Sequence, residues 1–290
     1  MFVPGGASLQ FAQIPMNYLG DNGSAGFLTT GAWSQKAVKE AAKYGSTYEV
    51  ASSQDTNFTT IPAVKNWQIP SDLNYIHLCT NETIHGVEWL GRAPRINVPL
   101  VADMSSHLLS RPMDYKNYSI IYAGTQKNLG TAGLCVLVVK TDFARSTRQE
   151  TPSLMQINNQ LDQNSMFNTP PVYAVWVLSL VLQWIEAEGG IVAMGKKNQE
   201  KASALYACID GSDLFSNPVD SSCRSLMNVP FSLTDKSLNR KFLDDAATNG
   251  LINLQGHRSV GGMRASIYNA ISKRDVEILI EFLREFERTA

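Results

Sequence analysis

The sequence predicts an α/β protein, with a mostly parallel, doubly wound sheet in a large domain and a smaller C-terminal α+β domain. From residue 1 to 197, short apolar runs rich in β-branched residues alternate with helical patterns, as they do in βαβ units. From residue 198 to 290 the order changes, and strands are mixed with helices. We therefore predict a large domain at 1–197 and a small domain at 198–290.

Local signals define the elements of the large domain. Strands are expected at 26–30, 47–51, 74–78, 98–102, 119–122 and 134–139. A glycine turn at the start of the chain leads into a helix from near Ser8, and a second helix is expected from a cap at Ser34 to a stop at Gly45. Residues 145–168 lack periodicity, and a loop of that length usually carries function.

Pro170 and Pro171 open a long helix that Gly189 stops. Its aromatic stripe is expected to pack in the core. The stripe belongs to an apolar face that includes Tyr173, Trp176, Val177, Leu180 and Trp184.

In the small domain we expect a helix at 191–208 and strands at 225–233, 251–255 and 263–268. A last helix begins at Ser272, which forms a capping box with Asp275.

Composition favours small-molecule chemistry. The chain has 25 Lys and Arg against 26 Asp and Glu, so nothing favours a nucleic-acid or acidic-lipid partner. The most apolar stretch, 172–185, is too short to span a bilayer, and the N-terminus has no signal-peptide pattern. The four cysteines have no CxxC spacing and lie mostly in apolar runs. We expect free thiols in a cytoplasmic protein, no membrane, and no metal site.

The main chemical signal is Lys127, on a polar, glycine-rich loop between two predicted buried strands. In an open α/β sheet, ligands bind outside the carboxyl ends of the strands. Trp33, Thr83 and Asp103 also follow strand ends, and the turn before Ser8 feeds a helix N-terminus that can bind phosphate. An amine, a carboxylate, an aromatic plate, a hydroxyl and a phosphate cradle match a pyridoxal phosphate site.

Each residue alone has a simpler explanation. Most lysines are solvated, a strand-end aspartate such as Asp103 often caps a turn, and a single tryptophan such as Trp33 is often core. Only their joint placement favours the cofactor. His77, His85 and His107 form no catalytic or metal motif with neighbours, and we interpret them as structural.

Longer motifs carry a family resemblance. GTQKNLG, NETIHGVE, ADMSSHLLSRP, SMFNTPP and GHRSVGGMRASIYNA resemble the phosphoserine aminotransferase family of class V, fold type I enzymes, and PGGASLQF resembles the family's phosphate loop. The resemblance covers essentially the whole chain. It implies pyridoxal 5'-phosphate as cofactor and transfer of an amino group between L-glutamate and 3-phosphohydroxypyruvate, giving O-phospho-L-serine and 2-oxoglutarate in serine biosynthesis.

The resemblance also implies residue roles. Lys127 would carry the Schiff base, Asp103 would pair with the pyridinium, Trp33 would stack, and Thr83 would hydrogen-bond near the ring. The cofactor phosphate would be held by Ala7, Ser8 and Gln126, together with Asn168 and Thr169 from the second subunit of a homodimer. Arg264 would bind the substrate α-carboxylate, and His257 with Arg258 the distal phosphate or carboxylate.

Family members carry several tens of residues ahead of the PGGASLQF equivalent, including a His-Arg pair that helps to bind substrate. We therefore expect part of the substrate pocket and of the dimer surface to be missing and an apolar face to be exposed. Two alternatives stay open. One is a truncated chain that binds cofactor or dimerises without turnover, and the other is a different class V enzyme, such as a desulfurase or another transaminase.

Overall fold

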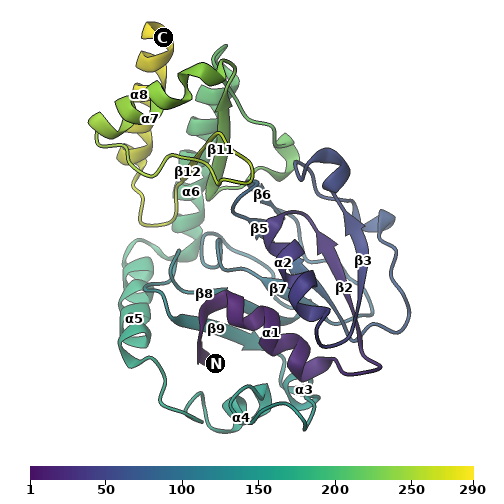
Figure 1. The fold of residues 1–290 in the computed structure, drawn as a ribbon. Helices are drawn as coiled ribbons and strands as arrows, with labels where there is room; N and C mark the ends of the chain where they lie inside the picture. The colour runs from purple at the N-terminus through teal and green to yellow at the C-terminus, as the bar shows by residue number, and fades with distance from the viewer.

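The computed structural model describes residues 1–290. Figure 1 shows a larger unit built on a central sheet and, above it, a smaller unit with its own sheet. The long helix α6 (Gly190–Asp210) runs from one unit into the other. The predicted boundary at 197/198 falls inside this helix and stays a prediction.

The central sheet has seven strands in the order β1-β9-β8-β7-β4-β2-β3. Five neighbouring strands, from β8 to β3, run parallel, while β9 is antiparallel to both β8 and β1. The strands are β1 (Phe2–Pro4), β2 (Ser24–Thr29), β3 (Ser46–Ser52), β4 (Tyr75–Cys79), β7 (Leu100–Asp103), β8 (Tyr118–Gly124) and β9 (Leu134–Val139). The mostly parallel sheet is confirmed, and every strand predicted in this domain lies within two residues of an observed one.

Separate cores cover the two faces of this sheet. On one face lie α1 (Gly6–Tyr18), α2 (Ala32–Ala41), α3 (Thr141–Arg145) and α4 (Ile157–Asp162). The other face is covered by α5 (Val172–Ala187) and by irregular segments. Side chains of β8 alternate between the cores, with Tyr122 in the first and Ile121 in the second. The short strands β5 (Asn81–Glu82) and β6 (Val87–Glu88) form a separate hairpin, and 3₁₀ turns lie at Gln54–Thr56 and Val64–Asn66.

The smaller unit is an α+β structure with a single core of 21 buried residues. Its antiparallel sheet consists of β10 (Phe215–Ser216), β11 (Asn228–Leu233) and β12 (Met263–Ser266). Its helices are α6, α7 (Asn239–Thr248) and α8 (Lys273–Thr289), with 3₁₀ turns at Ser221–Cys223 and Lys236–Leu238. The capping box between Ser272 and Asp275 at the start of α8 is confirmed.

Three predicted details are wrong. Ser34 is not the cap of α2, because the helix begins at Ala32 after Gly31 and Ser34 lies within its first turn. Residues 145–168 are not one loop, since α4 lies among them. Residues 251–255 form no strand and contribute only one isolated bridge, from Gln255 to Met263.

The aromatic stripe of α5 is not core, which corrects the prediction. Trp176 is 55% exposed and Tyr173 67% exposed, whereas the helix contacts the sheet through residues such as Leu178, which is 4% exposed. The helix is apolar on all sides, so periodicity alone cannot choose which side is buried. An apolar face is therefore exposed in this chain.

No single helix combines the length and the apolar composition needed to cross a membrane. The two helices α5 and α6 meet those criteria only as a pair, which is bent by 80° at the break between them.

Candidate active site

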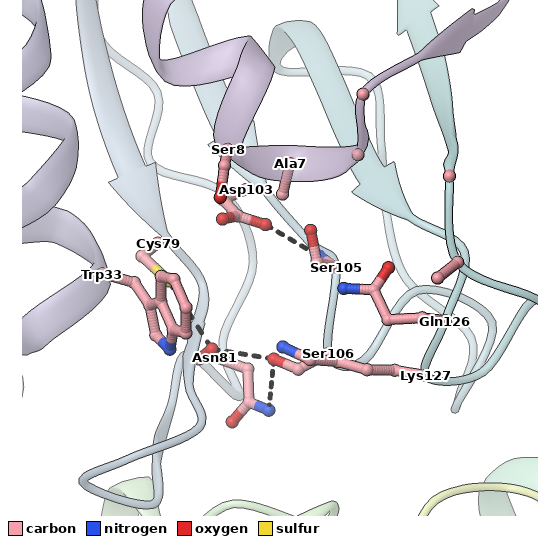
Figure 2. A pocket seen from close by; sticks show the side chains of 14 residues that line it. Ala7, Ser8, Trp33, Cys79, Asn81, Asp103, Ser105, Ser106, Gln126 and Lys127 are labelled. Carbon is pink, nitrogen blue, oxygen red and sulfur yellow. Dashed lines mark hydrogen bonds between the residues drawn. The ribbon is translucent and has the colours of Figure 1, made fainter.

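A cavity of about 380 Å³ opens at the carboxyl ends of β4, β7 and β8, in the volume range of small-molecule sites. Figure 2 shows its side chains converging from the start of α1, the start of α2 and the segments that follow these strands. Its lining includes six of the predicted site residues, namely Ala7, Ser8, Trp33, Asp103, Gln126 and Lys127. The topology thus gathers residues that lie up to 120 positions apart in sequence, from Ala7 to Lys127.

Lys127 enters the cavity from the loop after β8. Its neighbours Asn128 and Leu129 are buried, and the Asn128 side chain accepts a hydrogen bond from the Asn269 N–H at 3.0 Å. Lys127 itself is half-buried, and its Nζ lies 5.7 Å from the centroid of the Trp33 ring. The amine is therefore presented to the cavity by a fixed loop.

Asp103 is the last residue of β7 and is 6% exposed. Its Oδ1 accepts a hydrogen bond from the Ser105 N–H at 2.9 Å. Burial raises the pKa of this carboxyl, while hydrogen bonds from Ser105 and the charge of Lys127 act in the opposite direction. The carboxylate can accept a further hydrogen bond from a cationic group in the cavity.

The N-terminus of α1 forms one wall. Gly5 precedes the helix with φ 92°, in the left-handed region, and a Cβ there would lie 2.5 Å from the Leu9 side chain. No side chain caps the helix, so the N–H groups of its first turn, including those of Ala7 and Ser8, are available to an anion. Gln126 lies beside them, since a Cβ on Gly124 would meet both its amide oxygen and the Ala7 nitrogen.

Trp33 forms another wall, in the first turn of α2. Its indole N–H donates to the Thr83 hydroxyl at 2.6 Å, and its main-chain N–H donates to Glu82 Oε2 at 3.0 Å. Thr83 does not line the cavity itself; it holds the edge of the indole. The hydrogen bond to a cofactor expected of Thr83 stays a prediction.

Of the lining residues that the sequence analysis did not name as site residues, four carry a thiol, amide or hydroxyl side chain, namely Cys79, Asn81, Ser105 and Ser106. Each is the last residue of β4 or follows β4 or β7 by at most three positions, which is the signal that identified Asp103. The Asn81 amide donates to the Ser106 hydroxyl at 2.8 Å and to Asn228 of the smaller unit at 3.0 Å. These polar side chains therefore join the cavity wall to the smaller unit.

The predicted substrate-binding residues lie on the smaller unit, outside the cavity lining. Arg264 on β12 donates from Nη1 to the Thr83 carbonyl at 3.3 Å, and its buried Nε has no hydrogen-bond partner. His257 and Arg258 are exposed, and His257 contacts Ser259 of the same loop. The guanidinium makes one hydrogen bond to the chain, from Nη1, which leaves Nη2 for a ligand.

Asn168 and Thr169 also lie outside the cavity lining of this chain. Asn168 Oδ1 accepts a hydrogen bond from the Gln160 amide at 3.1 Å, and Thr169 is exposed just before α5. Their expected contact with the cofactor phosphate of a second subunit stays a prediction.

The donor set fits pyridoxal 5'-phosphate. The uncapped start of α1 suits a phosphate, the Asp103 carboxylate suits a protonated ring nitrogen, and the Trp33 ring suits stacking on an aromatic ring. Lys127 is the lysine that lines the cavity, where an aldehyde would meet it.

Comparison with known proteins agrees with this chemistry. The family model described as "Aminotransferase class-V" matches residues 1–279. A phosphoserine aminotransferase from Paraburkholderia phymatum is 47% identical over 289 residues, which are 99% of this chain and 80% of the relative. The chain belongs to the phosphoserine aminotransferase family. Another family member, from Pseudomonas aeruginosa, is 45% identical over 288 residues, again 99% of this chain and 80% of the relative.

Solved structures of family members share the fold. Phosphoserine aminotransferase from Bacillus circulans subsp. alkalophilus superposes with a TM-score of 0.97 at 40% identity, over 100% of this chain and 80% of that one. The structure of PLP-bound phosphoserine aminotransferase from Trichomonas vaginalis superposes with a TM-score of 0.92 at 36% identity, over 98% of this chain and 81% of that one. The fold type I architecture and membership of a family of pyridoxal-phosphate-dependent transferases are thus confirmed.

Proposed function

We propose that this chain is a phosphoserine transaminase that moves an amino group between L-glutamate and 3-phosphohydroxypyruvate, giving O-phospho-L-serine and 2-oxoglutarate. The main evidence for this function is that Lys127, Asp103, Trp33 and the uncapped start of α1 line one cavity. Family membership at 47% identity supports the choice of substrates. Three buried, unpaired thiols are compatible with the reducing cytoplasm as the place of the reaction.

Pyridoxal 5'-phosphate supplies an aldehyde for the amino group and a ring that accepts electrons. We assign its phosphate to the N–H groups of Ala7 and Ser8 and to Gln126. Asp103 keeps the ring nitrogen protonated, since an ionised carboxylate favours a cation beside it. Trp33 stacks on the ring and excludes water from that side.

Lys127 Nζ would hold the cofactor through its aldehyde. Once the substrate amino group has displaced it, the same amine would take the Cα proton of the amino donor in one half-reaction and give a proton to Cα of the amino acceptor in the other. The anchored loop keeps the amine in the cavity through both tasks, because Asn128 is tied to Asn269 of the smaller unit. A base held in position contributes to proton transfer only if it is within reach of the proton. The position of Lys127 in the cavity wall meets this condition.

Arg264 is proposed to bind the α-carboxylate shared by the two amino-acid substrates. Its planar guanidinium offers paired donors to a carboxylate, and its one hydrogen bond to the chain, from Nη1, leaves Nη2 available. His257 and Arg258 are proposed to bind the distal phosphate or carboxylate. A guanidinium beside an imidazole can bind either anion, so one pocket suffices for both half-reactions.

We propose a homodimer whose second subunit completes each site through Asn168 and Thr169. Both residues lie outside the cavity of their own chain, on the segment that leads into α5. A phosphate contact therefore requires a neighbouring copy.

The test is the conversion of 2-oxoglutarate to glutamate by the cofactor-loaded chain, with O-phospho-L-serine as amino donor. We expect turnover with phosphoserine and little with alanine or unphosphorylated serine, because these lack the distal anion. Lack of turnover with phosphoserine, while the chain binds cofactor, would contradict the proposal. Turnover with alanine in preference to phosphoserine would assign the chain to another class V activity.

A further inference from the structure

Glu82 is completely buried beside Trp33, and the proposed reaction assigns it no task. Its Oε1 accepts a hydrogen bond from the Ser34 N–H at 2.8 Å and lies 2.7 Å from the Ser34 hydroxyl. Its Oε2 accepts from the Trp33 N–H at 3.0 Å. One carboxylate therefore faces three donors in the first turn of α2.

These contacts replace the cap that α2 lacks. The residue before the helix is Gly31, which has no side chain to accept from the first N–H groups. A Cβ on Gly31 would lie 2.5 Å from Glu82 Cδ, so the carboxylate occupies the space that a capping side chain would need. A negative group at this end of the helix is also favoured by the helix dipole.

The next residue holds the other end of Trp33. The Thr83 hydroxyl accepts the indole N–H at 2.6 Å, while its carbonyl accepts from Arg264 Nη1 at 3.3 Å. Consecutive residues thus fix the Trp33 main chain and its ring. The same segment touches the arginine proposed to bind substrate.

We propose that Glu82 is a positioning residue, whose carboxylate fixes the first turn of α2 and thereby keeps the Trp33 ring against the cofactor cavity. The role rests on the proposed cofactor site. Glu82 can fill this role because an ionised carboxylate only accepts hydrogen bonds. A glutamine amide would turn an NH₂ group toward at least one of these donors, leaving it unsatisfied.

The test compares Glu82→Gln with Glu88→Gln in the full chain. Glu88 is a matched control because it is also fully buried and lies on the paired strand β6, yet it contacts Arg111 and Leu226 rather than Trp33. Two quantities are measured, the dissociation constant of pyridoxal 5'-phosphate and the quenching of Trp33 fluorescence on binding. The contribution of Trp33 is the fluorescence of the wild type minus the fluorescence of Trp33→Phe.

We expect Glu82→Gln to weaken cofactor binding by about tenfold and to reduce the Trp33 quenching, since hydrogen bonds to a buried charge are lost. Glu88→Gln should lower the melting temperature while cofactor affinity changes less than about twofold, because it does not touch the cavity. Unchanged affinity and quenching in Glu82→Gln would overturn the role, as would equal losses of affinity in both variants.

A double variant separates positioning from general destabilisation. In a Trp33→Phe background, Glu82→Gln should weaken cofactor binding by less than about twofold, because the group that it positions is gone. A full tenfold loss in that background would overturn the role. Should Glu82→Gln fail to fold, Glu82→Asp replaces it, because Asp keeps the charge but its shorter side chain moves the carboxylate away from α2. We expect Glu82→Asp to weaken cofactor binding in the wild-type background and to have less than about a twofold effect in the Trp33→Phe background.

The two proposals fail differently. Absence of cofactor binding by the wild-type chain would overturn the proposed function and this role together. Wild-type binding that Glu82→Gln leaves unchanged would overturn this role alone.

Discussion

Lys127 Nζ lies 5.7 Å from the centroid of the Trp33 ring, and both side chains line the cavity that also contains the Asp103 carboxylate. The amine follows β8 and the acid ends the neighbouring parallel strand β7, so the sheet itself brings them together. This relationship carries the proposed chemistry, because an amine and a carboxylate must reach opposite parts of one cofactor ring.

Replacing Asp103 by Asn tests the carboxylate. Burial raises the Asp103 pKa above its ordinary value of 3.8, and binding a protonated ring nitrogen favours the ionised carboxylate. Cofactor affinity of the wild type should therefore fall as pH falls through this raised pKa. Asp103→Asn should bind about tenfold more weakly at neutral pH and lack that part of the pH dependence. Fluorescence titrations from neutral pH down toward the ordinary carboxyl pKa of 3.8 measure both, and an unchanged pH profile in the variant contradicts the assignment.

Replacing Arg264 by Lys tests the substrate carboxylate site. Lysine keeps the charge but loses the planar pair of donors, so KM for phosphoserine and for glutamate should each rise about tenfold with little change in cofactor affinity. Arg240→Lys, on the exposed surface of α7, serves as the control and should leave both values unchanged. Steady-state kinetics measure both KM values. An unchanged KM in Arg264→Lys would show that Arg264 does not bind the substrate carboxylate.

The exposed face of α5 predicts a contrast within one helix. Trp176 is 55% exposed and Leu178 is 4% exposed. Trp176→Gln should change the free energy of unfolding by less than about 0.5 kcal/mol, whereas Leu178→Ala should lower it by about 2–5 kcal/mol. Chemical denaturation measures both values. A large loss for Trp176→Gln would mean that this face is covered in solution.

His77 predicts a pH effect on stability. It is buried in β4, 2.8 Å from the Tyr122 hydroxyl, and burial lowers its pKa from 6.5 to about 3. Between these values the unfolded chain binds a proton that the folded chain excludes, so stability is present above pH 6.5 and is lost as pH falls toward 3. The contribution is about 1.4 kcal/mol per pH unit.

His77→Gln keeps a neutral hydrogen-bonding side chain and should remove that contribution from the slope of unfolding free energy against pH. Denaturation of both proteins at several pH values below 6.5 measures the difference. Parallel slopes would show that the ring is protonated in the folded chain.

Asp103 and Lys127 could be predicted from the sequence because a short buried strand followed by a polar residue is a local pattern, and parallel strands put such residues at one edge. Glu82 could not, since its partners lie nearly fifty positions away and only the folded chain brings them together. The buried side of α5 was missed for a different reason. A helix that is apolar all round carries no periodic signal for direction.

The central claim is that Lys127 is the amine that binds the cofactor aldehyde. The most direct measurement is incubation with pyridoxal 5'-phosphate, reduction with borohydride and mapping of the labelled peptide. Lys36 is the internal control, because its Nζ lies 4.1 Å from the Trp33 ring centroid, closer than that of Lys127. We predict one label on the Lys127 peptide, lost in Lys127→Ala and retained in Lys36→Ala. A label that stays in Lys127→Ala and disappears in Lys36→Ala would contradict the account.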